Sequence, residues 1–258
     1  MSQEMIVVSR HDTIVTLTMN RPAMMNALDL DMIGEMQRVL DGLRADTGAR
    51  VVVLEGAGGN FCTGASMGLF TEGLSAPFWQ DGMNRLHRVI LTLREIPQPV
   101  ICKVKGMAVG GGANIALAGD FVVAAHTAKF RQVFVNHGLV LDTGGTYFLP
   151  RLVGMVKARE LALLGPMIDG QTAASIGLIY KSVSDEELDG VVDTLAATLA
   201  KKPPRAAGLI KGSLERSFDM TLREVLDWEA AQQAIMVQTD DVKEAGLRFL
   251  KGKGGNKA

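Results

Sequence analysis

One acid and two glycine-rich turns lie close together in the segment 106–146, and these residue types could manage charge on a reacting oxygen. The first turn is the triple glycine at 110–112, and the second is the pair of glycines at 144–145, shortly after Asp142. A short apolar run typical of a helix follows each turn. Because glycine has no Cβ and a helix start presents unpaired N–H groups, each turn could hold a negative oxygen. The pattern therefore predicts that one turn stabilises a developing oxyanion while Asp142 carries the proton.

Each of these features also has a purely structural interpretation. The triple glycine lacks the third glycine of a dinucleotide-binding fingerprint, so it is either a donor turn or a tight strand-to-helix turn. Asp142, taken alone, is typical of a helix cap or a turn. His137 is close to Asp142 in the sequence and is a candidate for the same site, although a lone histidine is more often only packed or exposed.

The segment 64–68 reads Gly-Ala-Ser-Met-Gly and matches the pattern around the nucleophilic serine of one class of hydrolases. That serine needs a strong strand directly before it, whereas the residues before Ser66 are rich in glycine and polar side chains. A catalytic histidine should follow late in the chain, but the last histidine is His137. The sequence therefore argues against a serine hydrolase.

The composition argues against several other classes of protein. The chain has 258 residues and a formal net charge of −1, so no basic surface favours nucleic acid or an anionic membrane. No apolar run approaches the roughly 20 residues of a membrane span, and no signal peptide is recognisable. The cysteines, Cys62 and Cys102, lack metal-ligand spacing. We expect reduced thiols, no metal and a cytoplasmic location.

The elements that must position these residues alternate between strands and helices in the first part of the chain. Strand patterns occur at 13–19, 50–54, 100–104 and 121–125, and helical spacing occurs at 28–43 and 78–93. After about residue 155, helices are expected at 155–164, 171–176, 186–201, 204–217, 221–236 and 240–250, and only 178–183 looks like a strand. This alternation predicts an α/β fold, with a core at 1–200 and a helical C-terminal region at 201–258.

Several long motifs resemble those of the enoyl-CoA hydratase/isomerase family, the crotonase superfamily. They are NRPAMMNAL (20–28), GAGGNFCTGASM (56–67), PVICKVKGMAVGGGANIALAGDFVVAA (99–125), GLVLDTGGTYFLPRLVG (138–154) and FLKGK (249–253). The resemblance implies a spiral of repeated β-β-α units with a helical C-terminal trimerisation region, in a homotrimer or a dimer of trimers. It also implies an acyl-CoA thioester substrate, no separate cofactor, and an oxyanion hole made by the backbone N–H groups of Ala65 and Gly111.

Two residues depart from the hydratases of that family. The resemblance places two water-activating glutamates where this chain has Asn114 and Phe134, and neither side chain can do general acid–base work. Asp142 remains, and its surroundings resemble those of isomerases near 1,2-epoxyphenylacetyl-CoA isomerase. A single carboxylate suits isomerisation, because it can remove a proton at one carbon and return it at another. An apolar neighbour such as Phe134 would raise the pKa of Asp142.

The resemblance also implies a set of residues that bind the substrate. They are Met24, Thr63, Ser66, Met67, Gly112, Asn114, Phe134 and His137. Met24 stands where relatives often have a basic residue near CoA, so Lys251 or Lys253 is a candidate for contacting the phosphates. Aliphatic, cyclic and phenylacetate-derived acyl groups all stay open.

These observations predict an acyl-CoA isomerase of fatty acid or phenylacetate catabolism that uses Asp142 as acid and base. Three alternatives stay open. The first is an enoyl-CoA hydratase, a lyase, with an atypical site. The second is an enzyme like 4-chlorobenzoyl-CoA dehalogenase, in which Asp142 would be the nucleophile. The third is a protein that binds acyl-CoA without catalysis.

Overall fold

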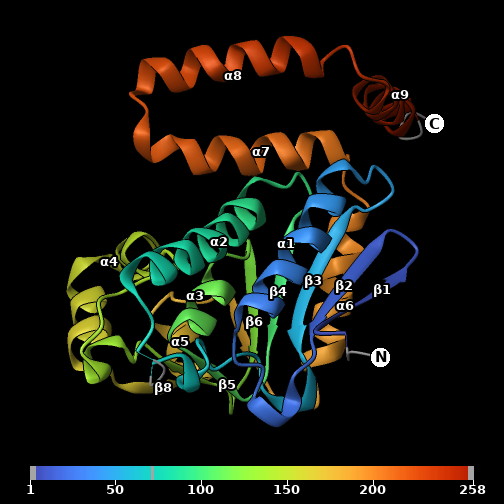
Figure 1. Cartoon of the computed structure of the whole chain (residues 1–258). Coiled ribbons are helices and arrows are strands. Elements are labelled where there is room, and N and C mark those ends of the chain that lie inside the picture. Colours follow the sequence, from blue (N-terminus) through green and yellow to red (C-terminus); the bar gives the residue numbers. More distant parts are fainter. Residues whose placement is uncertain (1–3, 71–72, 255–258) are drawn as a thin grey trace. The chain divides into compact units, whose positions relative to one another are not determined.

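The computed structural model describes residues 4–70 and 73–254, without the side chains of Met67, Phe70 and 251–254. The chain divides into two compact units, Met1–Lys201 and Lys202–Ala258, which we describe separately. Strands and helices alternate along the first unit, so the α/β fold expected from the sequence is confirmed (Figure 1).

A six-stranded sheet forms the centre of the first unit, in the order β1-β2-β3-β4-β6-β9. Its strands are β1 (Ile6–His11), β2 (Ile14–Met19), β3 (Val51–Gly56), β4 (Val100–Val104), β6 (Phe121–Ala125) and β9 (Lys181–Val183). Strands β1 and β2 are antiparallel, and the other neighbouring pairs are parallel. The central strands β3, β4 and β6 are buried along most of their length, which explains their continuous apolar runs.

A smaller sheet leads the chain to the triple glycine. Its strands, in the order β5-β7-β8, are β5 (Met107–Val109), β7 (Lys129–Arg131) and β8 (Met167–Asp169). Strand β5 ends one residue before Gly110, whose φ of 55° turns the chain into the next helix. Glycine suits this position because its φ lies in the left-handed region.

Six helices and four 3-10 turns complete the first unit. They are η1 (Pro22–Met24), α1 (Leu30–Ala45), η2 (Ala57–Gly59), η3 (Met67–Phe70), α2 (Ala76–Glu95), α3 (Gly111–Leu117), η4 (Phe134–His137), α4 (Gly145–Leu164), α5 (Gly170–Ser175) and α6 (Leu188–Ala200), all within the described residues. The Asp29 carboxylate caps α1 by accepting the N–H of Met32 at 2.9 Å. Helices α1 and α6 cover opposite faces of the larger sheet (Figure 1).

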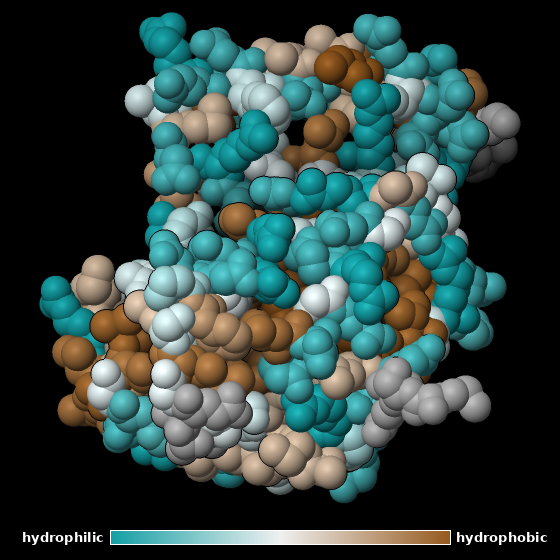
Figure 2. Space-filling view, viewed as in Figure 1, coloured by the Kyte–Doolittle hydropathy of each residue, from teal (hydrophilic) through white to brown (hydrophobic). Residues whose placement is uncertain are grey.

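Helix α4 carries several exposed apolar side chains. Figure 2 shows apolar residues gathered over the part of the first unit where α4 lies in Figure 1. The exposed apolar side chains of α4 include Leu152, Met155, Val156, Leu163 and Leu164. Among the described residues, no helix combines the length and the apolar character that crossing a bilayer would require.

The second unit consists of helices only, within the described residues. They are α7 (Pro204–Arg216), η5 (Ser217–Asp219), α8 (Leu222–Met236) and α9 (Asp240–Gly254). Helix α8 begins at a capping box formed by Thr221 and Glu224. The indole N–H of Trp228 donates to Ser213 Oγ at 2.9 Å and connects α8 with α7. The use of this unit in trimerisation stays a prediction.

The sequence prediction was wrong for the short strands. The segment 178–183 is a strand only from Lys181, and β8 is a second strand after residue 155. Strands β1, β5 and β7 were not predicted either. Strands of three residues, such as β5, β7 and β8, are too short to show an alternating pattern, and four of the six residues of β1 are exposed.

Candidate active site

The segment around Cys62 packs backbone to backbone against the strand that leads to the triple glycine. The N–H of Cys62 donates to the carbonyl of Met107 at 3.0 Å, and the N–H of Val109 donates to the carbonyl of Cys62 at 3.0 Å. A Cβ at Gly112 would collide with the Cys62 carbonyl. Gly112, one of the predicted binding residues, therefore makes this close packing possible through its lack of a side chain.

Gly64 approaches the same turn from the other segment. Its φ is 81°, and a Cβ there would lie 2.9 Å from the carbonyl oxygen of Val109 and 3.2 Å from the nitrogen of Gly111. Both the backbone conformation and the close approach require glycine. The two segments that carry the predicted oxyanion donors are therefore in direct contact.

The predicted donors Ala65 and Gly111 are both next to Gly64. The N–H of Leu28 donates to the carbonyl of Gly64 at 2.8 Å, and the N–H of Ser66 donates to the carbonyl of Leu28 at 2.9 Å. The intervening N–H of Ala65 therefore points away from Leu28. Gly111 is the first residue of α3, so no earlier carbonyl of that helix can accept its N–H. This arrangement can offer two backbone N–H groups to one oxygen beside Gly64.

Asp142 begins a tight turn that brings its carboxyl to the same place. The N–H of Gly145 donates to the Asp142 carbonyl at 2.8 Å, and φ is positive at Thr143 (52°) and Gly144 (81°), as in a type I′ turn. The Thr143 hydroxyl donates to Asp142 Oδ1 at 2.6 Å. A Cβ at Gly111 would lie 3.9 Å from the same Oδ1. The carboxyl is therefore beside a predicted oxyanion donor.

Burial raises the pKa of the Asp142 carboxyl, while the Thr143 hydrogen bond and the positive charge of protonated His87 act in the lowering direction. A raised pKa brings the group closer to the range in which it can both accept and return a proton. The sequence predicted this direction from Phe134 as an apolar neighbour. The structure places the buried Phe134 ring beside the Cβ position of Gly110, at 3.8 Å.

His87 was not predicted as a site residue. It lies on α2 and is exposed, as expected for the solvent face of an amphipathic helix. Its charge acts on Asp142 although 55 positions separate the two residues in the sequence. No local sequence pattern connects them, because only the fold brings α2 near the turn at Asp142.

Asn114 is completely buried beneath this site. Its side-chain Nδ2 donates to the backbone carbonyl of Asp142 at 2.8 Å, and its Oδ1 accepts from Nε2 of Gln132 at 2.9 Å. Asn114 was expected among the residues that bind substrate. In the structure its polar atoms contact the protein itself, and Gln132 is a neighbour that the sequence did not reveal.

The other expected binding residues lie at varied places. Met24 is about half exposed in η1, and the Thr63 hydroxyl donates to the carbonyl of Met25 at 3.4 Å. Ser66 is half-buried beside Ala65, whereas the side chain of Met67 lies outside the described part, as do those of Lys251 and Lys253. His137 is exposed at the end of η4, and among the described residues no hydrogen bond or ion pair joins it to Asp142.

Comparison with known proteins bears on what this arrangement does. The family described as enoyl-CoA hydratase/isomerase matches residues 9–254. The chain is 36% identical to 1,2-epoxyphenylacetyl-CoA isomerase of Escherichia coli (strain K12) over 240 residues, which are 92% of each protein. It is 31% identical to crotonyl-CoA hydratase of Syntrophomonas wolfei over 257 residues, which are 99% of this chain and 98% of the relative.

Solved structures agree with these sequence matches. The crystal structure of a putative enoyl-CoA hydratase from Streptomyces coelicolor A3(2) has a TM-score of 0.92 and 32% identity, covering 96% of this chain and 92% of that chain. An enoyl-CoA hydratase from Bacillus anthracis has a TM-score of 0.91 and 29% identity, covering 97% of both chains.

Proposed function

The chain belongs to the enoyl-CoA hydratase/isomerase family, and from this premise we propose that it is an acyl-CoA isomerase with Asp142 as acid and base. The observation that carries the proposal is the position of the Asp142 carboxyl, whose Oδ1 lies 3.9 Å from the Cβ position of Gly111. This distance supports the proposal, because a carboxyl there is next to a backbone N–H that can stabilise an oxyanion.

The proposed reaction moves a double bond along the acyl chain. With a 3-enoyl thioester, the Asp142 carboxylate removes a proton from C2, and the negative charge moves onto the thioester oxygen. The N–H groups of Ala65 and Gly111 stabilise that oxygen, and loss of one such donor typically costs about 10²–10³-fold in rate. Protonated Asp142 then returns the proton at C4, which leaves the double bond between C2 and C3.

The surroundings of Asn114 support isomerisation over hydration. Hydration needs a group that activates water, and Asn114 is buried with its Nδ2 and Oδ1 bonded to Asp142 and Gln132. Phe134, at the other position where the resemblance placed a glutamate, has no group that can exchange a proton. On this proposal the Asp142 carboxyl does the acid–base work, which suits isomerisation.

A hydratase with an atypical site is the second candidate function. The observation in its favour is the 31% identity to crotonyl-CoA hydratase over 99% of this chain. On this alternative Asp142 would activate a water molecule, and the product would be a 3-hydroxyacyl thioester.

The substrate that we propose is an acyl-CoA thioester, with no cofactor besides the CoA of the substrate. Met24, Thr63 and Ser66 are three of the described side chains that we expect to contact it, because they lie close to Ala65 or to the Leu28 segment that pairs with it. The name of the relative from Escherichia coli makes a phenylacetate-derived acyl group one specific compound class to test. We keep the cytoplasm and a homotrimer or dimer of trimers as parts of the proposal.

A single-turnover experiment in deuterated water tests the proposal. The wild type, Asp142→Asn and the control Asp193→Asn, which changes an exposed carboxyl on α6, are each incubated with 3-enoyl-CoA and 2-enoyl-CoA. We expect double-bond migration with deuterium at C2 or C4 in the wild type and the control, and neither in Asp142→Asn. Rapid formation of 3-hydroxyacyl-CoA, or full isomerase activity in Asp142→Asn, contradicts the proposal.

A further inference from the structure

A chain of two buried side-chain amides ends at the backbone carbonyl of Asp142. Nε2 of Gln132 donates to Oδ1 of Asn114 at 2.9 Å, and Nδ2 of Asn114 donates to the Asp142 carbonyl at 2.8 Å. Gln132 is only 5% exposed, and Asn114 is fully buried. The chain reaches the turn from the side of α3 and β7, and neither of its amides belongs to the acid–base chemistry proposed for Asp142.

The direction of these hydrogen bonds is determined at Asp142. A backbone carbonyl only accepts, so the amide of Asn114 must present its NH₂ group to it. Oδ1 of Asn114 then faces Gln132, which must present its own NH₂ group. Oε1 of Gln132 is left over, and among the described residues this buried oxygen has no hydrogen-bond partner.

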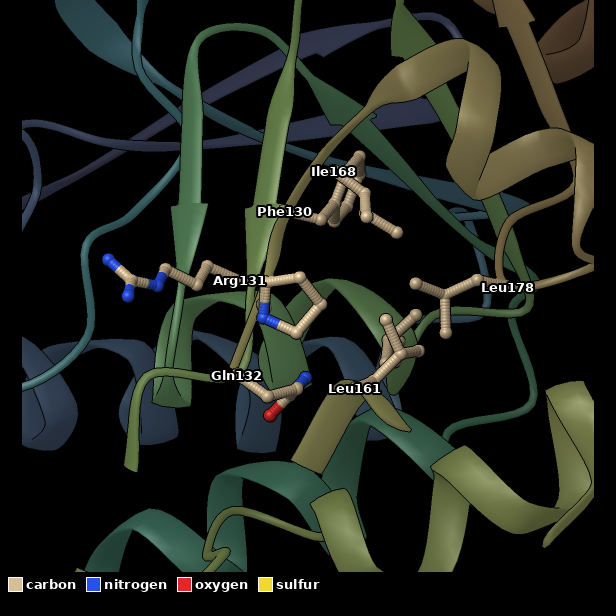
Figure 3. Close-up of a pocket in the computed structure, with 9 residues that line it drawn as sticks. Phe130, Arg131, Gln132, Leu161, Ile168 and Leu178 are labelled. Carbon is tan, nitrogen blue, oxygen red and sulfur yellow. The ribbon is translucent and has the colours of Figure 1, made fainter. Parts of the chain in front are cut away.

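The surroundings of Gln132 give no other reason for an amide at this position. Gln132 lines a small hollow (Figure 3). Most of the other residues that line it are apolar: Ala113, Leu117, Phe130, Leu161, Pro166, Ile168 and Leu178. An unpartnered buried oxygen costs free energy, whereas an apolar side chain of similar length would fit this environment.

The turn that this chain holds is strained. Thr143 has a φ of 52°, and a β-branched residue rarely adopts this left-handed conformation. The Asp142 carbonyl next to it accepts two hydrogen bonds, from Gly145 N–H and from Asn114. Release of the Asn114 bond would let the peptide after Asp142 rotate, and the carboxyl would move relative to Gly111.

We propose that Gln132 is a positioning residue, which holds the amide of Asn114 in the orientation that fixes the Asp142 turn against the oxyanion donors. The inference rests on the proposed function of Asp142. Gln132 acts through Asn114 and touches no reacting atom, so its contribution belongs to the chemical step and not to CoA binding.

The substitution Gln132→Met tests this role. Methionine keeps the length and removes both polar atoms, so the unpartnered Oε1 disappears while Oδ1 of Asn114 loses its donor. The number of unpartnered buried oxygens stays the same, and we expect the melting temperature to change by less than about 3 °C. We expect kcat to fall by about 10–100-fold with KM unchanged, because misplacement by about 1 Å can cost 10²-fold.

Gln98→Met is the matched control. Gln98 is also buried, and its Nε2 donates to the backbone carbonyls of Leu43 and Asp46 at 2.9 and 3.1 Å. The substitution Gln98→Met removes a hydrogen-bond donor from each of these two carbonyls and supplies no other donor. The free energy of unfolding should therefore fall. The folded fraction of Gln98→Met should keep the kcat of the wild type, which separates destabilisation from mispositioning.

The substitution Gln132→Glu should change the pH dependence of kcat, which a purely structural role of Gln132 would not do. A neutral glutamic acid can donate its O–H to Oδ1 of Asn114, whereas an ionised glutamate cannot. The ratio of kcat in Gln132→Glu to that of the wild type should therefore fall as pH rises, while the same ratio for Gln132→Met stays constant.

The outcomes distinguish this inference from the proposed function. If Asp142→Asn is inactive while Gln132→Met keeps the kcat of the wild type, the positioning role is wrong and the function of Asp142 stands. If Asp142→Asn is fully active, the proposed function fails and the inference fails with it. If Gln132→Met loses stability and kcat together, as a structural residue would, the positioning role is also overturned.

Discussion

The hydroxyl of Thr143 donates to Oδ1 of Asp142 at 2.6 Å from a backbone conformation with φ of 52°. The left-handed region is unfavourable for a β-branched residue, and such strain persists only where surrounding contacts impose it. Here the strain directs the hydroxyl at the carboxyl, and both groups lie against Gly111: its Cβ position is 3.1 Å from Thr143 Oγ1 and 3.9 Å from Asp142 Oδ1. The turn therefore holds the proton carrier and its hydrogen-bond donor as one unit.

Thr143→Val should raise the pKa of Asp142 further, because the hydroxyl that stabilises the carboxylate is lost. The acidic limb of the pH profile for kcat should then move to higher pH. The fall in kcat relative to the wild type should therefore be largest at acidic pH, where more of the variant's carboxyl is protonated, and should shrink as pH rises. Thr146→Val, at an exposed position of α4, is the matched control and should leave the profile unchanged. An unshifted acidic limb in Thr143→Val would count against the role of this bond.

Asp142→Asn should stabilise the fold at neutral pH. Burial raises the pKa of Asp142, so between the unfolded and folded pKa values the folded state binds more protons than the unfolded state. Stability therefore decreases as pH rises through this window, and the asparagine variant escapes that decrease. We expect Asp142→Asn to melt at a higher temperature than the wild type above the window, with the difference shrinking below it.

Asp169→Asn is the control, and its effect on the melting temperature should have the opposite sign. The backbone N–H of Thr172 holds the pKa of the Asp169 carboxyl below its usual range, so this carboxyl contributes stability above the unfolded pKa that is lost as pH falls. Its replacement should lower the melting temperature at neutral pH and have little effect in acid. Thermal unfolding from about pH 3 to pH 8 compares the two variants, and equal shifts of the same sign would contradict the argument.

His87→Gln should also raise the pKa of Asp142, since the positive charge of protonated His87 lowers it. The acidic limb of the kcat profile should move to higher pH in this variant. The difference from the wild type should shrink in 1 M salt, because screening shortens the Debye length to about 3 Å. His11→Gln changes an exposed histidine at the end of β1 and serves as the control. Coincident profiles of wild type and His87→Gln at low salt would exclude an effect of this charge on catalysis.

The sequence predicted many elements from their apolar patterns. The segments 100–104 and 121–125 are β4 and β6 with the same bounds, whereas the helix expected at 28–43 begins at Leu30 and the one expected at 155–164 begins at Gly145. The site was predicted only in parts. Motifs pointed to the turns at Ala65 and Gly111 and to Asp142, but their mutual contact depends on a backbone packing between Cys62 and Gly112 that no local pattern encodes.

Two residues around Asp142 left no sequence signal at all. Gln132 follows a three-residue strand and reaches Asn114 across 18 positions, and His87 looks like any polar residue on the solvent face of a helix. Asn114 was visible as a departure from a family pattern, which suggested contact with substrate. Its bond to the Asp142 carbonyl required the folded chain, because only there are the two residues neighbours.

Gly64→Ala should disrupt the oxyanion hole, and the chain offers a closely matched control for it. Gly64 and Gly59 have nearly the same φ, 81° and 80°. An alanine Cβ at Gly64 would lie 2.9 Å from the Val109 carbonyl oxygen and 3.2 Å from the Gly111 nitrogen, whereas at Gly59 it meets no atom within 4 Å. Both variants bear the strain of a left-handed alanine, which costs about 1 kcal/mol or more.

Only Gly64→Ala pushes the segment of Ala65 away from Gly111. If both N–H groups bind the same oxygen, kcat in this variant should fall by about 10²–10³-fold, the usual cost of one lost oxyanion donor. Gly59→Ala should lose a similar amount of stability from strain alone and keep the kcat of the wild type. The measurement is kcat for double-bond migration beside the melting temperature of each variant. Equal kcat values in the two variants would mean that the contact between Gly64 and Gly111 does not set the geometry of the reaction.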